Sequence, residues 1–209
     1  MSWRWILVLV ALVGAWHWWT HERPVARAAG QLVLGVPMQR DIDPPEMFDP
    51  HAEDGTTASK TPTFKLARRA RYDLTVRVLR KEIYRLDGGA AIAPVDLAVG
   101  WARMSDSAML EQLSITQMGR FFYWRPKDAA TFNVPADALI SEVAQIHAIP
   151  ATREIDDTLR RLRPGQLVTL GGYLVDVVAP GFTWKTSLTR TDTGDGACEI
   201  MWIESVALR

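Results

Sequence analysis

The residues of this chain best suited to nucleophilic chemistry are a cysteine and a histidine. Cys198 is the single cysteine, and His147 lies in an apolar stretch upstream of it. A thiol and an imidazole can act as nucleophile and general base, with Asp192 or Glu199 orienting the imidazole. This chemistry requires an exposed thiol in a polarising pocket. Cys198 instead begins a predicted strand, where a small buried thiol is the usual occupant, so we interpret it as structural. A cysteine-type hydrolase using Cys198 and His147 is the alternative.

A second candidate site is the triplet Asp192-Thr193-Gly194, which matches the catalytic triplet of aspartic proteases. Those enzymes place the triplet at the end of an apolar strand, beside a second aspartate that shares its proton. Here the flanking residues are polar, and Asp-Gly pairs favour a hairpin turn. Calcium coordination by Asp192, Asp195 and Glu199 is the alternative, although the spacing of an EF-hand is absent. We therefore predict a chain with no catalytic residues, no metal and no cofactor.

Two segments contain the residue types that dominate binding interfaces. Basic side chains concentrate between Lys65 and Arg85, and an aromatic group runs from Phe121 to Trp124. Arginine and aromatic side chains contribute most to the energetics of interfaces. A solvated strand face would explain the basic segment equally well. We expect a binding surface that includes Arg68, Arg69, Arg71, Tyr123 and Trp124.

Composition narrows the class of partner. The chain has 24 basic and 24 acidic residues, so its net charge is zero and no overall field recruits nucleic acid or anionic lipid. Nucleic acid is therefore not an expected partner. The single cysteine also excludes an intramolecular disulfide and a cysteine-rich metal site.

The amino-terminal residues have the composition of a membrane anchor. Tryptophans bracket the uncharged apolar run 6–15 on both sides, at Trp3, Trp5, Trp16, Trp18 and Trp19. Indole rings prefer the level of the lipid headgroups, so the two groups indicate the two ends of a transmembrane helix. A cleaved signal peptide and a buried helix of a soluble protein are the alternatives. We predict an uncleaved anchor over residues 1–21, with the following domain in the periplasm.

The remaining residues divide into a tether and a globular part. Residues 22–63 are predicted as an extended tether, because the stretch 41–62 is rich in prolines and acidic residues. The short apolar segment 31–36 is either a first strand or part of that tether. Residues 64–209 carry the strand and helix patterns of one α+β domain.

Local patterns place the elements of this domain. Residues 72–78 alternate between apolar and polar side chains, which predicts a strand with one buried face. Thr152 begins a predicted helix that Pro164-Gly165 ends. Residues 166–178 are predicted as a long strand with a bend at Gly171-Gly172, followed by strands over 183–188 and 198–206. The predicted carboxyl-terminal half is a curved β-sheet or small barrel, and its pattern resembles oligonucleotide-binding and SH3-like barrels.

Residues 94–101 and 187–199 are similar to stretches of uncharacterised bacterial proteins that are membrane-anchored or exported. The resemblance implies a component of the bacterial envelope and no particular activity. Together these observations predict a single-pass protein of the bacterial inner membrane. Its exported domain is expected to act as a binding or assembly module for other envelope proteins rather than as an enzyme.

Overall fold

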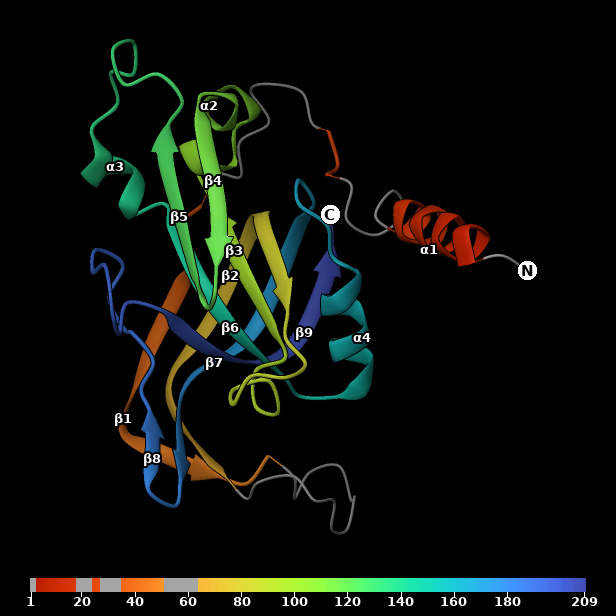
Figure 1. The fold of residues 1–209 in the computed structure, drawn as a ribbon. Coiled ribbons are helices and arrows are strands. Elements are labelled where there is room, and N and C mark those ends of the chain that lie inside the picture. The colour runs from red at the N-terminus through yellow and green to blue at the C-terminus, as the bar shows by residue number, and fades with distance from the viewer. Residues whose placement is uncertain (1–2, 18–23, 27–34, 51–63) are drawn as a thin grey trace.

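The computed structural model describes residues 3–17, 24–26, 35–50 and 64–209 (Figure 1). The helical elements within these residues are α1 (Trp3–His17), the 3-10 turn η2 (Arg103–Ser105), α2 (Ser107–Glu111), α3 (Ala136–Ile140) and α4 (Arg153–Arg161). The strands are β1 (Met38–Phe48), β2 (Lys65–Ile83), β3 (Val95–Gly100), β4 (Leu113–Met118), β5 (Phe121–Pro126), β6 (Val143–Pro150), β7 (Leu167–Ala179), β8 (Phe182–Trp184) and β9 (Glu199–Leu208).

The long strand β2 organises the main sheet, because it pairs with β1, β3 and β7. The sheet continues from β3 to β6, from β6 to β9 and from β9 back to β7, so five strands pair in a closed ring. Only the β6–β9 pair in this ring is parallel. The predicted α+β class and curved sheet are confirmed. The ring draws its strands from both halves of the domain and not from the carboxyl-terminal half alone.

Side chains that alternate along these strands fill the inside of the ring. On β2 the inward set is Tyr72, Leu74, Val76 and Val78, as the alternation of residues 72–78 predicts. The other strands add an apolar set that includes Leu97, Ile146, Leu170 and Met201. Helix α4 contributes Leu159 to the same core. This burial of apolar surface is the main stabilising term for the domain.

The outer face of β3 is covered by the separate hairpin β4–β5 together with α2 and α3 (Figure 1). A second apolar cluster joins Leu79 and Ala98 of the ring to Met104, Leu113 and Leu139 of this cover. Outward side chains of β3 are therefore buried as well as inward ones, and every residue of β3 is buried.

Helix α4 follows its predicted signals. The Thr152 side chain accepts a hydrogen bond from the Ile155 backbone N–H, which caps the helix. The helix ends at Arg161, just before Pro164-Gly165. The bend predicted at Gly171-Gly172 coincides with a shift in the register between β7 and β9.

The structure differs from the predicted tether at residues 38–48, which form β1 and pair with β2. The prolines of this segment fall between Asp41 and Glu46, where the register shifts and the ladder is interrupted. Phe48 packs edge-on against Trp202, with 5.5 Å between ring centroids, and so attaches the strand to the core. Residues 22–23, 27–34 and 51–63 of the predicted tether lie outside the described residues.

The strand predicted over 183–188 is also shorter than expected, because β8 ends at Trp184. Beyond it, side chains take over the hydrogen bonding. The Thr186 backbone N–H donates to Asp176 Oδ1, and the Ile200 backbone N–H donates to Thr186 Oγ1. These bonds satisfy backbone groups without a regular ladder.

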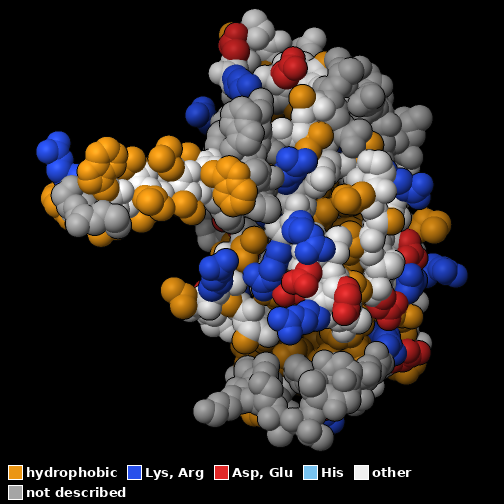
Figure 2. Space-filling view, turned by 90° about the vertical axis from the view of Figure 1, so that its right-hand side faces the viewer, with side chains coloured by type: hydrophobic (Ala, Val, Ile, Leu, Met, Phe, Trp, Pro, Cys, Tyr) orange, Lys and Arg blue, Asp and Glu red, His pale blue; other side chains and the backbone are white. Residues whose placement is uncertain are grey.

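Helix α1 covers fifteen residues of the predicted anchor, and its apolar side chains are exposed. Figure 2 shows it as an arm with hydrophobic side chains on its visible face, whereas acidic and basic side chains mix over the body. Trp18 and Trp19 lie outside the described residues. Within the part of the chain that the structure describes, no helix has both the length and the apolar character needed to span a bilayer.

The bend in β7 generates a stability prediction. A Cβ at Gly172 would overlap the Trp202 carbonyl oxygen of β9, so Gly172→Ala should lower the free energy of unfolding by about 1–3 kcal/mol through overpacking. Gly88→Ala is the matched control, because a Cβ there meets open space. Urea denaturation of both variants measures the effect. Equal stability of the two variants would contradict the close approach of β7 and β9.

Candidate ligand-binding pocket

A pocket of about 400 Å³ lies between the hairpin β4–β5 and the loop that precedes β9. Its walls come from residues 121–124 of β5, residues 143–145 of β6 and residues 189–199 of the loop and the start of β9. The three segments are distant in the sequence, so the pocket exists only because the ring brings β6 and β9 together.

The aromatic wall of the pocket is formed by β5. Side chains alternate along this strand, so Phe122 and Trp124 pack against the cluster that covers β3, while Phe121 and Tyr123 are exposed. All of these aromatic residues line the pocket. The wall therefore combines rings fixed by packing with rings that are accessible to a ligand.

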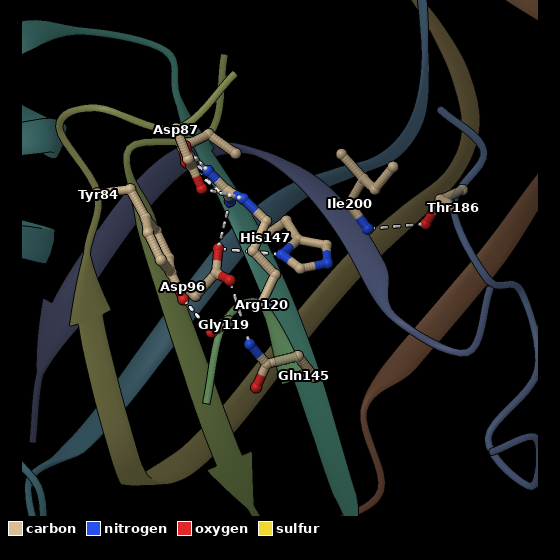
Figure 3. Close-up of polar contacts among 10 residues, drawn as sticks. Tyr84, Asp87, Asp96, Gly119, Arg120, Gln145, His147, Thr186 and Ile200 are labelled. Atoms are coloured by element: carbon tan, nitrogen blue, oxygen red, sulfur yellow. Dashed lines mark hydrogen bonds and ion pairs between the residues drawn. The ribbon is translucent and has the colours of Figure 1, made fainter. Parts of the chain in front are cut away.

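Arg120, at the turn of the hairpin, fixes this wall to the ring (Figure 3). Its guanidinium donates two hydrogen bonds to Asp87, at 2.9 and 2.8 Å, and one to Asp96 Oδ1 at 3.0 Å. It also lies 4.2 Å from the centroid of the Tyr84 ring, and the Tyr84 hydroxyl donates to the Gly119 carbonyl. A bidentate, stacked arginine is a strong attachment, so the position of the hairpin is well defined.

Asp96 is the centre of this polar network and is completely buried (Figure 3). Besides Arg120, it has His147 Nδ1 at 3.0 Å from Oδ1 and accepts a hydrogen bond from Gln145 Nε2 at 3.4 Å. The His147 ring packs against Trp184, with 4.6 Å between ring centroids. His147 is therefore a buried residue beside a carboxylate, as expected for a histidine of the core.

Two residues of the pocket lining each carry a buried oxygen that has no hydrogen-bond partner among the described residues. Gln145 turns its amide nitrogen to Asp96, which leaves Oε1 with no hydrogen bond among the described residues. Glu199 Oε2 also lacks a partner within the described part of the chain. Both residues are only 4% exposed. Because buried polar atoms are normally paired, these two oxygens keep hydrogen-bonding capacity that the described residues do not use.

Burial determines the charge of Glu199. Desolvation raises the pKa of its carboxyl group to about 8, and Asp192 acts in the same direction, whereas the cation of Arg190 opposes it. The carboxyl group is therefore mostly neutral at pH 7. Arg190 gives it no direct hydrogen bond, because its guanidinium donates instead to the Tyr72 hydroxyl at 2.6 Å and to Gln39 Oε1 at 3.3 Å.

Cys198 also lines the pocket but has the properties of a structural thiol. It is buried, and desolvation, reinforced by Glu199 and Asp96, raises the pKa of its thiol to about 12. A nucleophilic cysteine requires the opposite shift. His147 directs Nδ1 to Asp96 and not to the thiol. The geometry gives no support to a pair of Cys198 and His147 acting as nucleophile and base.

The predicted binding residues separate into two groups. Tyr123 and Trp124 line the pocket, whereas the arginines of β2 lie elsewhere and are paired internally. Arg69 bonds Asp176 at 2.6 Å, and Arg71 bonds both Asp73 and Glu204. Arg68 lies over the rings of Phe48 and Tyr173, at 4.1 and 4.8 Å from their centroids. These arginines stabilise the sheet, so a partner would have to compete with existing contacts.

Residues 192–196 lie in a polar loop and do not form the predicted hairpin turn, because β8 pairs with β7 whereas β9 pairs with β6 and β7. Asp192 Oδ2 accepts a hydrogen bond from Ser187 Oγ in this loop. Among the described residues, no three His, Cys, Asp or Glu side chains gather in a manner that could hold a metal ion. Sequence reasoning overlooked Gln145 as a residue of the pocket lining. Glu199 carried a usable signal, because it is an acidic residue between Cys198 and the apolar run 200–203 of the predicted strand.

Comparison with known proteins finds no protein-family model, no curated protein and no solved structure that matches this chain. The functional argument is therefore built from the geometry of the pocket and from the composition of the chain.

The raised pKa of Glu199 predicts how stability depends on pH. The carboxyl group ionises near its ordinary pKa of 4.5 in the unfolded chain but only near 8 in the folded domain, so stability is lost as the pH rises between these values. Glu199→Gln removes this titration. The variant should gain stability relative to the natural protein from pH 5 to pH 8, by a few kcal/mol, since one pKa unit is worth about 1.4 kcal/mol.

Urea denaturation at a series of pH values measures this difference. Glu111→Gln, the same substitution at an exposed acid, is the control. Its free energy of unfolding should differ from that of the natural protein by the same amount at every pH. A flat difference for Glu199→Gln as well would show that the carboxyl group ionises normally in the folded domain.

Proposed function

We propose that this protein is a binding module of the bacterial envelope, held at the inner membrane by a single amino-terminal helix, with its ring of strands presenting the pocket to a partner in the periplasm. The observation that carries the proposal is the pair of unpartnered buried oxygens, Gln145 Oε1 and Glu199 Oε2, beneath an exposed aromatic wall. Binding sites are typically concave and apolar, with a few polar groups that fix the orientation of the ligand.

The strand order supports a barrel of the oligonucleotide/oligosaccharide-binding type, with five strands in a Greek-key arrangement. In chain order the ring strands are β2, β3, β6, β7 and β9, and their spatial order is first, second, third, fifth, fourth and back to first. Helix α4 connects the third strand to the fourth. Such barrels bind ligands on the face of their second and third strands and through adjoining loops. The pocket occupies this region, because it is lined by β6 and by the loop before β9.

The membrane anchor is supported by the surface of α1. Its apolar side chains are exposed, and tryptophans lie near both ends, at Trp3, Trp5 and Trp16. A helix that is apolar on all sides normally requires either a protein core or lipid around it. A bilayer would supply this environment, and the indole rings would lie at its interfaces. Nucleic acid is a less suitable partner than lipid, because the arginines Arg69 and Arg71 of β2 are paired with acidic residues and the net charge of the chain is zero.

If α1 inserts into lipid, a charged side chain in the middle of the helix should weaken membrane binding strongly. Leu9→Asp places a carboxylate in the middle of the helix and should weaken membrane binding by about 3 kcal/mol, which is roughly a hundredfold change. Leu86→Asp is the matched control, because Leu86 is 99% exposed on the domain surface. Flotation of the full chain with liposomes measures binding. Equal flotation of both variants would contradict a membrane role for α1.

The role of the pocket is tested separately by partner recovery. Tyr123→Ala removes an exposed ring from the aromatic wall and should lower the recovery of envelope partners from detergent-solubilised membranes by about fivefold or more, since interface aromatics often contribute more than 1 kcal/mol. Phe182→Ala is the control, because Phe182 is an exposed ring on β8 outside the pocket. Loss of the same partners from both variants, or from neither, would count against the pocket as the binding site.

A further inference from the structure

We propose that the pocket receives a cation that donates N–H hydrogen bonds, an alkylguanidinium or alkylammonium group such as the side chain of an arginine or lysine. The inference rests on the proposed binding function and specifies the chemistry that the pocket recognises. It follows from the acceptors, the charges and the rings that line the pocket.

The polar atoms of the pocket lining that have no partner among the described residues are both oxygens. The amide nitrogen of Gln145 is occupied by Asp96, so only its oxygen is available, and Glu199 presents Oε2. A ligand that donates hydrogen bonds fits the amide oxygen of Gln145, and it fits Glu199 once that carboxyl group is ionised and has only acceptors. Guanidinium and ammonium groups have only donors, and bonds from a charged donor are stronger than those from a neutral one. An incoming cation would also favour the ionised form of Glu199, whose pKa burial otherwise raises to about 8.

The charges around the pocket favour a cation over an anion. Asp192 and Asp195 lie at the exposed rim and Glu199 at the buried end, whereas Arg190 is the single basic residue of the lining. The guanidinium of Arg190 is already engaged, because it donates to the Tyr72 hydroxyl and lies over the Tyr72 ring. An anionic ligand would meet two rim carboxylates, and an unpaired charge of like sign is a common means of excluding a partner.

The aromatic wall supplies the remaining part of a cation site. Phe121 and Tyr123 are exposed and line the pocket, and cations bind favourably over aromatic faces. The domain already uses this combination for its own arginine. Arg120 is held by the carboxylates of Asp87 and Asp96 and by the face of the Tyr84 ring. The pocket offers an external cation the same two kinds of contact, a carboxyl group and aromatic rings.

Isothermal titration calorimetry of the full chain in mild non-ionic detergent tests the proposal with two probes of equal length. N-acetyl-arginine amide carries the guanidinium, and N-acetyl-citrulline amide replaces it with an uncharged urea group. The arginine probe should bind at least tenfold more tightly than the citrulline probe. A short glycine peptide with one central arginine distinguishes the source of the cation, because tighter binding of the peptide indicates a side chain of a partner protein and equal binding indicates a small molecule.

Two variants locate the site. Glu199→Gln keeps the shape of the side chain and should weaken the arginine probe about tenfold to a hundredfold, while leaving the citrulline probe unchanged. Asp195→Asn, on the exposed rim, should weaken it about threefold without any risk to folding. Asp157→Asn, at an exposed position of α4 outside the pocket, is the matched control and should bind as the natural protein does.

Equal binding of the two probes, binding of neither, or full affinity in both pocket variants would overturn the cation assignment. This failure differs from failure of the binding module itself. If Tyr123→Ala still reduces partner recovery while the arginine probe does not bind, the pocket binds a ligand of another class. If both measurements fail, the pocket is not a binding site.

Discussion

The pairing of β2 with β7 is the constraint on which the rest of the structure depends. It runs from Lys65 opposite Val178 to Arg77 opposite Leu167 and converts a curved sheet into a closed ring. A closed ring has no free edge between these strands and encloses a core that alternating side chains must fill. Closure also requires sharp bends, which explains the register shifts between Arg68 and Ala70 and between Gly171 and Gly172.

On the outer face of the ring, β3 and β6 carry polar side chains. These side chains need hydrogen-bonding or charged partners wherever the face is covered. The β4–β5 hairpin covers this face and buries Asp96 completely. A buried carboxylate is costly unless it is paired, and Arg120 supplies the pairing from the turn of the same hairpin. The cover and its attachment are thus linked, because the segment that desolvates Asp96 also carries the cation that compensates for it. The same carboxylate orients Gln145 by accepting a hydrogen bond from its amide nitrogen. The amide oxygen of Gln145 is therefore left unpaired among the described residues.

Burial is the main cause of the raised pKa values of two neighbouring residues of the pocket. Desolvation keeps both the Cys198 thiol and the Glu199 carboxyl group protonated at neutral pH, which removes a nucleophile and leaves a neutral hydrogen-bonding group. Glu199 lies in a strand where an apolar residue would stabilise the domain more. It lies instead at the buried end of the pocket, and functional sites commonly sacrifice some stability.

Local signals in the sequence were sufficient for the elements whose causes are local. The Thr152 cap and Pro164-Gly165 bound α4, the alternation of residues 72–78 marks β2, and the Gly171-Gly172 pair marks the bend of β7. The sequence alone also determined the apolar composition of the amino-terminal segment, the aromatic group that became a wall of the pocket and the exclusion of an intramolecular disulfide. Only the tertiary structure decided that the proline-rich segment 38–48 is an edge strand, because an interrupted ladder tolerates prolines that a continuous strand would not. It alone decided that the arginines of β2 are paired and that Gln145 and Glu199 face one cavity, because these relations depend on strands that are distant in the sequence and become neighbours only when the ring closes.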